Sequence, residues 1–265
     1  MFKSIMPPFL YSLYQKFRKK YGYFGEYKSW EAARSKASGY DDGEIIEKVK
    51  NAALKVKNGE AAYERDSVLF EQAEPTPHLL APLLWIASKN NNKLEVLDFG
   101  GALGTTYYQN KEYLNHLDLK WSIIEQPKFV EYGKNLFEDE TLRFYGDLND
   151  YKSKPDVVLL GSVLQYLESP YQVLEKIIQM EPKYILIDKT PFLKNSGDTI
   201  TVQRVPPKIY DASYPSWIFD LNKMLDFMKI HKYNLLYEVS SQNIEMYNFG
   251  EKQVSWKGFL FEKNE

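Results

Sequence analysis

The chain has 265 residues, a formal net charge of −2 and no cysteine. This length fits one large α/β domain with an N-terminal extension, and the lack of cysteine excludes disulfides, thiolate zinc sites and cysteine nucleophiles. The near-neutral charge argues against broad electrostatic binding to nucleic acid. We find no apolar run that could span a bilayer and no signal-peptide pattern, and we expect a cytoplasmic protein.

Residues 1–92 are predicted to form a helical extension, and residues 93–265 the sheet-containing domain. Apolar residues at helical spacing predict helices over 42–57 and 78–86. These helices are expected to pack beside the sheet and to cover its ligand site.

An aromatic and apolar set extends from Phe2 to Phe17, and a basic cluster follows it. Such a segment could make weak peripheral contact with an anionic membrane, at the inner face of the cytoplasmic membrane. The segment is short and is broken by Pro7 and Pro8, which favours an arm packed on its own domain or on a partner subunit.

A glycine-rich loop follows a short apolar run that contains one acid, Asp98. Three glycines lie within five residues: Gly100, Gly101 and Gly104. The pattern predicts a buried strand that leads into a helix through a loop whose backbone approaches a ligand. The G-x-G-x-x-G pattern of dinucleotide enzymes fails, because Ala102 and Thr105 replace its second and third glycines. The spacing instead resembles the first motif of class I S-adenosylmethionine (SAM) methyltransferases, with Ala102 in place of a common glycine.

Four further apolar segments, each ending near an acid or a glycine, are predicted to be strands separated by helices: 121–125, 142–145, 155–161 and 184–188. Open α/β sheets bind ligands at the carboxyl ends of such strands. A helix over 219–230 and two strands over 233–239 and 256–261 are expected to follow. The predicted fold is a Rossmann-like class I methyltransferase fold with a mostly parallel, seven-stranded sheet.

The cofactor implied by this fold is SAM. Glu125 would accept hydrogen bonds from ribose hydroxyls, and Asp147 would lie near the adenine amine. The candidate cofactor-binding residues are Asp98, Gly100, Gly101, Gly104, Glu125, Gln126, Gly146, Asp147 and Ser162. Taken singly, each acid is better explained as the cap of a strand or the start of a helix, and the SAM interpretation depends on their occurring together in this order.

Long, unusual segments occur almost from end to end of the chain: Tyr21–Gly25, Ser38–Asp41, Ala62–Ser67, Val96–Gly104, Ile124–Pro127, Ser162–Leu167, Ile187–Phe192, Thr201–Gln203, Val205–Pro207 and Ile209–Pro215. In these segments the chain resembles a family of bacterial SAM-dependent methyltransferases encoded among surface-polysaccharide genes. The resemblance implies SAM use and a role in making capsule or lipopolysaccharide. It does not identify the substrate, and Ala102 and Lys189 are mild departures from the expected forms.

Methyl transfer to a sugar hydroxyl requires positioning and usually a general base. After the fourth strand, where methyltransferases of small alcohols often have a histidine, this chain has Gln165, which cannot act as a base. Gln165 could instead orient the acceptor or the methionine moiety. His116 and His231 are expected at the surface or as caps. His78 could reach the cleft, but a core or capping role is expected.

Two carboxylates are left as candidate bases, Asp188 at the end of the fifth strand and Asp211 in an irregular, proline-rich segment. Each has a structural alternative, as a cap or ion pair for Asp188 and as a turn residue for Asp211.

Basic and aromatic residues could hold a phosphorylated or nucleotide-linked sugar, and the candidates for substrate binding are Arg65, Lys189, Arg204, Tyr210 and Tyr214. The sequence thus predicts a SAM-dependent O-methyltransferase of a sugar or sugar-linked group, with no metal site and with no prediction of oligomeric state. The alternatives are a non-catalytic SAM-fold scaffold and, less favoured, a dehydrogenase.

Overall fold

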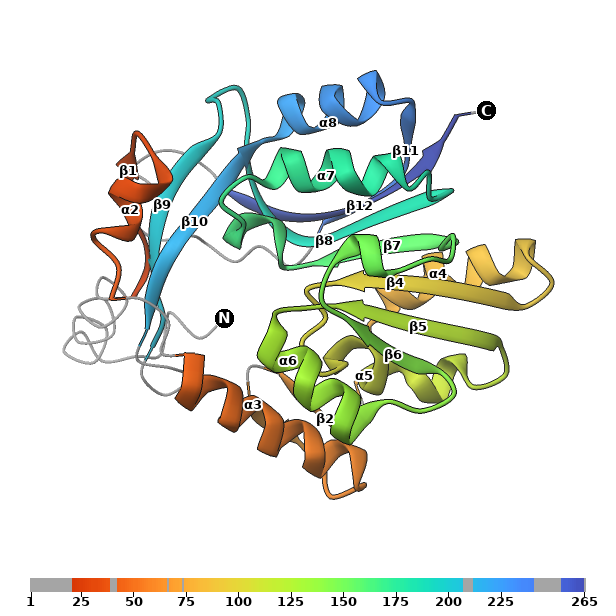
Figure 1. Ribbon diagram of the computed structural model, residues 1–265. Coiled ribbons are helices and arrows are strands. Elements are labelled where there is room, and N and C mark those ends of the chain that lie inside the picture. Colours follow the sequence, from red (N-terminus) through yellow and green to blue (C-terminus); the bar gives the residue numbers. More distant parts are fainter. Residues whose placement is uncertain are drawn as a thin grey trace, which may run out of the picture.

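The computed structural model describes residues 21–38, 42–65, 67–72, 74–206, 212–240 and 254–264. Its centre is a ten-stranded sheet with helices on both faces (Figure 1). The parallel part contains the five predicted strands: β4 (Lys93–Phe99), β5 (Asp118–Ile124), β6 (Leu142–Tyr145), β7 (Val157–Gly161) and β8 (Tyr184–Leu193). Their order is β6-β5-β4-β7-β8, so the direction of winding reverses between β4 and β7. Ligands of open α/β sheets bind outside the carboxyl ends of the strands at such a switch point.

An antiparallel pair closes the sheet beyond β8, as the sequence predicts. Strand β12 (Ser255–Lys263) pairs antiparallel with both β8 and β11 (Tyr233–Ser240). The preceding helix, α8 (Leu221–Ile230), begins two residues later than the predicted 219, because Phe219 and Asp220 still pair with β8.

Three more strands make the predicted number of seven too low. Strand β8 continues beyond Asp188 to Leu193, and its end pairs parallel with β10 (Ser213–Asp220). Strand β10 in turn pairs with β9 (Thr199–Arg204), and β9 pairs with β1 (Gly22–Tyr27). Part of the segment expected to be irregular is therefore a strand. Pro215 pairs with Val202 of β9. It is compatible with the strand because only Phe219 and Asp220 of β10 pair with β8, so at Pro215 the strand has a partner on one side.

The region before residue 92 is not purely helical. It contains helices α2 (Trp30–Arg34), α3 (Asp42–Lys57) and α4 (Pro77–Lys89), a hairpin of β2 (Tyr63–Arg65) and β3 (Val68–Phe70), and strand β1 of the main sheet. The predicted helices over 42–57 and 78–86 are confirmed as α3 and α4. Residues 1–20, on which the predicted membrane contact depends, lie outside the described residues. Within the described part of the chain, no helix is long and apolar enough to cross a membrane.

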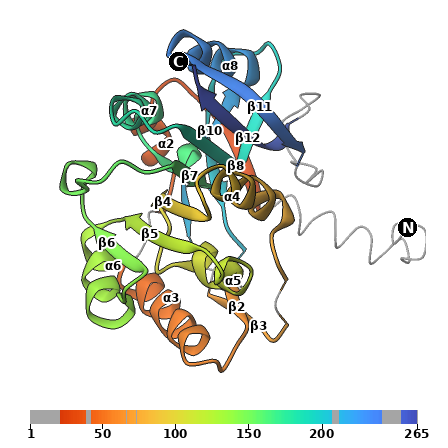
Figure 2. The same cartoon turned by 90° about the vertical axis from the view of Figure 1, so that its right-hand side faces the viewer.

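Two clusters of buried side chains lie on opposite faces of the sheet, and Figure 2 shows the helices that cover the sheet. Helices α3, α4 and α5 (Thr105–Leu114) pack on one face, and α7 (Pro170–Gln179) and α8 pack on the other. Side chains of a strand alternate between faces, so Val96 of β4 joins the first cluster and Leu97 the second. By the same alternation, Asp98 of β4 and Asp188 of β8 belong to the face covered by α4 and α5.

Candidate functional site

The carboxyl ends of β4 and β7 meet at one edge of the sheet, beside the middle of β8. Asp98 pairs with Leu159 of β7, and Leu159 pairs with Leu186 of β8. Gly161 pairs with Asp188, so Asp188 lies level with Gly100 at the beginning of the glycine loop. The predicted cofactor loop and the predicted base therefore share this edge.

Close contacts explain the glycines of the loop. Gly100 has φ +78°, and a Cβ there would lie 2.5 Å from Cγ2 of Val163. A Cβ on Gly101 would lie 2.6 Å from Oδ2 of Asp98. Gly104, with φ 95°, precedes the first residue of α5. The loop thus fits tightly over β4 and against the segment after β7, and larger residues at Gly100 and Gly101 would force it outward.

Asp98 is 2% exposed and lies beneath this loop, with its Oδ2 accepting a hydrogen bond of 3.2 Å from Nε1 of Trp121. Burial raises the pKa of Asp98 to about 7, since ionisation inside the protein lacks solvation. The geometry shows Asp98 supporting Gly101 from below. Its predicted contact with a cofactor stays a prediction.

The raised pKa of Asp98 predicts a pH-dependent stability. The pKa of Asp98 is about 7 in the folded protein and 3.8 in the unfolded chain, so the stabilisation is full below the unfolded pKa and is lost as the pH rises towards 7. Between pH 5 and pH 7.5 the wild type should lose about 2 kcal/mol relative to Asp98→Asn, measured by urea unfolding. Asp226→Asn, at an exposed position, should follow the wild type. Parallel pH profiles of the wild type and Asp98→Asn would contradict a carboxyl that titrates near neutral pH.

Glu125, at the tip of β5, is tied to the glycine loop. Its Oε1 accepts a hydrogen bond of 3.2 Å from the Ala102 amide, and its Oε2 accepts one of 2.7 Å from the Gln126 amide. Burial raises the pKa of Glu125, while these two amide bonds lower it. Gln126 itself is exposed and precedes α6 (Pro127–Tyr132). The structure therefore brings the second predicted acid to the loop.

The tip of β6 is more open. Gly146 and Asp147 are exposed, and Oδ1 of Asp147 accepts a 2.8 Å hydrogen bond from the Asn149 amide at the start of η3 (Leu148–Asp150). The capping role that the sequence left open for Asp147 is thus present. Its predicted role near an adenine amine stays a prediction.

Strained backbone marks the end of β7 and the middle of β8. Ser162 has φ 57° and Lys189 has φ 45°, both in the left-handed region that non-glycine residues seldom adopt. The fully buried amide of Gln165, in η4 (Leu164–Tyr166), donates to Oγ of Ser162 at 3.0 Å and to the Lys189 carbonyl at 3.3 Å. Gln165 thus joins the segment after β7 to Lys189 of β8. Its Oε1 has no hydrogen-bond partner in the described part of the chain.

Asp188 pairs with His78, at the start of α4. Their Nε2 and Oδ2 atoms are 3.2 Å apart, the Asp188 side chain is 2% exposed and the His78 side chain 28% exposed. The expectation that His78 serves the core or a cap missed this contact. The two residues are 110 positions apart, and only its place before the first strand hinted that His78 could reach the cleft.

The β2–β3 hairpin reaches the beginning of α5. Buried Glu64 accepts a hydrogen bond from Oγ1 of Thr105, directly after the glycine loop, and another of 3.1 Å from the Ser67 amide. This contact brings the hairpin to the start of α5. The next residue, Arg65, is exposed, and its guanidinium carbon lies 5.8 Å from the centre of the Tyr63 ring.

The other predicted substrate residues lie on the added strands. Arg204 of β9 stacks 4.6 Å from the Phe24 ring, so it comes from a different part of the fold than Arg65. Tyr214 of β10 makes an edge contact with Tyr166, with ring centroids 5.2 Å apart. The Tyr166 hydroxyl also donates to Gln203 at 2.9 Å, which links the segment after β7 to β9 and β10. The candidates Tyr210 and Asp211 lie outside the described residues.

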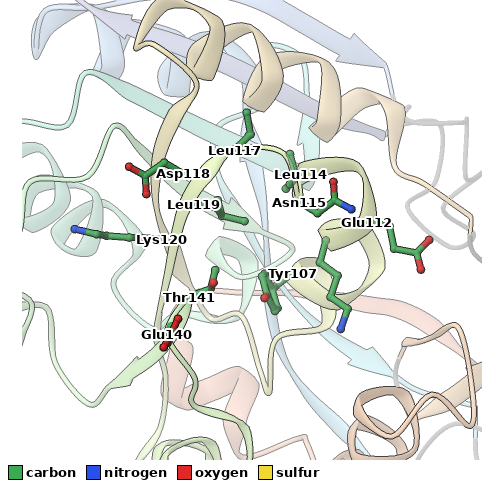
Figure 3. A pocket seen from close by; sticks show the side chains of 11 residues that line it. Tyr107, Glu112, Leu114, Asn115, Leu117, Asp118, Leu119, Lys120, Glu140 and Thr141 are labelled. Atoms are coloured by element: carbon green, nitrogen blue, oxygen red, sulfur yellow. The ribbon is translucent and has the colours of Figure 1, made fainter.

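A cavity of about 560 Å³ lies elsewhere (Figure 3). Its walls include Tyr107 and Leu114 of α5 and Asp118 and Lys120 of β5. Asp118 is the first residue of β5, so the cavity opens at the amino edge of the sheet. Because catalytic ligands of open α/β sheets bind at the carboxyl edge, we assign this cavity no part in the chemistry.

The chain has an α/β fold with a mostly parallel central sheet and flanking helices, and it resembles solved structures in this fold. No model of a known protein family and no curated protein sequence matches the chain. Among solved structures, the N-terminal domain of EvdMO1, crystallised in the presence of S-adenosylhomocysteine (SAH) and D-fucose, is 12% identical over 85% of this chain and 98% of that chain, with a TM-score of 0.50. This likeness shows the fold alone.

Two further solved structures are methyltransferases by name. Magnesium protoporphyrin IX methyltransferase from Synechocystis PCC 6803, with bound SAH, is 11% identical over 84% of this chain and 100% of that chain, with a TM-score of 0.49. Burkholderia thailandensis 1,6-didemethyltoxoflavin-N1-methyltransferase, with bound 1,6-didemethyltoxoflavin and SAH, is 9% identical over 86% and 92%, with a TM-score of 0.45.

Proposed function

We propose that this protein is a SAM-dependent methyltransferase. The observation that carries the proposal is the contact of Glu125 with Ala102 at the switch point, because it sets a carboxylate beside a glycine loop that departs from the pyrophosphate-binding pattern. SAM has a ribose for such a carboxylate and no phosphate. When bound, it would supply an electrophilic methyl group on a sulfonium. The EvdMO1 domain, which has a similar fold and was crystallised in the presence of SAH, supports the same cofactor.

The proposed acceptor is a hydroxyl of a sugar or sugar-linked group, in the assembly of capsule or lipopolysaccharide at the inner face of the cytoplasmic membrane. The resemblance to methyltransferases of surface-polysaccharide gene clusters supports this class. The D-fucose present with the EvdMO1 domain is consistent with it. Tyr166 and Tyr214, whose rings are in edge contact, offer aromatic faces to a sugar, and Arg204 could contact a phosphate of a nucleotide-linked precursor.

Calorimetric titration with SAM, SAH and NAD tests the cofactor. We expect micromolar binding of SAM and SAH and none of NAD, because the loop lacks two glycines of the dinucleotide pattern. Binding of NAD alone would overturn the proposal. Tight SAM binding without methyl transfer from labelled SAM to UDP-glucose, GDP-mannose or dTDP-rhamnose would favour the scaffold alternative.

A further inference from the structure

The pair of His78 and Asp188 has the asymmetry of a base held by a buried acid. The carboxylate is 2% exposed and the imidazole 28% exposed, so the acid lies inside and the ring reaches the edge. Asp188 is level with Gly100, and only β7 separates β4 from β8. Gly100 and Asp188 are therefore about 10 Å apart, which is two strand spacings. The dyad thus lies on the same edge and face of the sheet as Asp98 and the loop above it.

The contact fixes which ring nitrogen can accept a proton. Nε2 lies 3.2 Å from Oδ2 of Asp188, so in the neutral ring Nε2 carries the hydrogen and donates it to the carboxylate. Nδ1 is then the basic nitrogen. Within the residues that the structure describes, Nδ1 of His78 has no hydrogen-bond partner, and neither does the buried Oδ1 of Asp188.

Both members of the dyad are held firmly. The buried Asn110 of α5 accepts hydrogen bonds from the amide and hydroxyl of Thr76, at 3.1 and 2.7 Å, two residues before His78. On the other side, the Asp188 carbonyl accepts a 2.9 Å bond from the Ser162 amide. A solvated surface pair would need neither anchor. Strained backbone and unsatisfied buried acceptors gathered at one strand edge are typical of a functional site.

Resting on the proposed function, we propose that His78 is the general base of methyl transfer and that Asp188 is its positioning residue. The acceptor hydroxyl would give its proton to Nδ1 of His78 as its oxygen bonds to the methyl carbon and the carbon–sulfur bond of the sulfonium breaks. The sulfur keeps the electron pair of that bond, leaving neutral SAH and a methyl ether. The proton stays on His78 as an imidazolium beside the Asp188 carboxylate, and then passes to water.

A general base at His78 also limits the chemical class of the methyl acceptor. A carboxylate or a neutral amine is already nucleophilic at neutral pH, whereas a sugar hydroxyl needs its proton removed during the transfer. A base that is oriented by a buried acid therefore favours a neutral alcohol. The proposal also explains why the chain can lack a histidine after β7, because His78 of α4 provides the base instead.

Turnover is the first test. On whichever of UDP-glucose, GDP-mannose or dTDP-rhamnose the wild type methylates, His78→Ala should lower kcat by about 100-fold or more, leave SAM affinity unchanged and regain activity on addition of imidazole. Asp188→Ala should lower kcat without such rescue. His116→Ala, at an exposed position, is the control. Wild-type kcat in His78→Ala would overturn the proposal.

A spectroscopic test needs no acceptor. The chain has three histidines, so ¹⁵N imidazole spectra can be assigned with the two variants His78→Ala and His116→Ala. We expect the neutral His78 ring to carry its proton on Nε2, with that proton exchanging slowly with water and exchanging fast in Asp188→Ala. A proton on Nδ1 would overturn the dyad even if SAM binds. Absence of SAM binding to the wild type would instead overturn the proposed function, whatever the spectrum shows.

Discussion

Replacing Glu125 with alanine should weaken SAM binding by at least about 100-fold. A carboxylate that accepts two hydrogen bonds from ribose hydroxyls contributes about 1.5–3 kcal/mol for each bond, and 1.4 kcal/mol is a factor of ten in affinity. The same substitution removes the bond from the Ala102 amide to Oε1, so the glycine loop also loses its tie to β5. Calorimetry with SAM and SAH measures both effects.

The matched control for this variant is Glu131→Ala. Glu131 is exposed on the neighbouring helix α6, so its removal changes the net charge equally and should leave the affinity as it was. Circular dichroism and thermal melting would establish that Glu125→Ala is folded. An affinity within a few-fold of the wild type in a folded Glu125→Ala would remove Glu125 from the cofactor site.

The parallel core of this fold could be predicted because its signals are local. Each strand from β4 to β8 is a short apolar run followed by an acid, a glycine or a turn residue, and the loop glycines announce the switch point. The closing pair of β11 and β12 carries equally plain apolar patterns. These signals do not depend on where the rest of the chain lies.

The added strands could not be predicted in this way. Strand β1 pairs with β9 across more than 170 residues, for example Gly22 with Arg204, and no periodicity records such a partner. Pro215 favoured an irregular segment in place of β10. A proline is tolerated there because β10 pairs with β8 only through its last two residues. The continuation of β8 beyond Asp188 depends on β10 and β12, which pair with its end.

The site shows the same limit. The sequence identified Asp188 and Glu125 because each ends a predicted strand, yet it could not join His78 to Asp188 across 110 residues. Nor could it show that Asp98 lies beneath Gly101, where it supports the loop. Residue types at strand ends predict where chemistry occurs, whereas partnerships between side chains depend on packing.

Because Gly101 packs on Asp98, we expect the effects of Gly101→Ala and Asp98→Ala on the free energy of unfolding to be strongly coupled. Gly101→Ala should destabilise the protein by about 1–3 kcal/mol, the usual cost of overpacking, because the new Cβ would lie 2.6 Å from Oδ2 of Asp98. Gly101 is absent from the residues with positive φ, so alanine meets no backbone penalty there and the cost is steric. Urea unfolding measures the change, and SAM affinity should fall with it as the loop moves outward.

In an Asp98→Ala background, Gly101→Ala should change the free energy of unfolding very little, because the carboxylate with which the new Cβ would clash is absent. The double-mutant cycle should therefore give a coupling energy of about 1–3 kcal/mol between the two positions. Gly59→Ala is the control for a glycine with no atom within 4 Å of the added Cβ and with φ +77°, so its cost should come from backbone strain and be unchanged by Asp98→Ala. Additive effects of Gly101→Ala and Asp98→Ala would mean that the carboxylate does not lie under the loop, and the support that Asp98 gives to the glycine loop would be disproved.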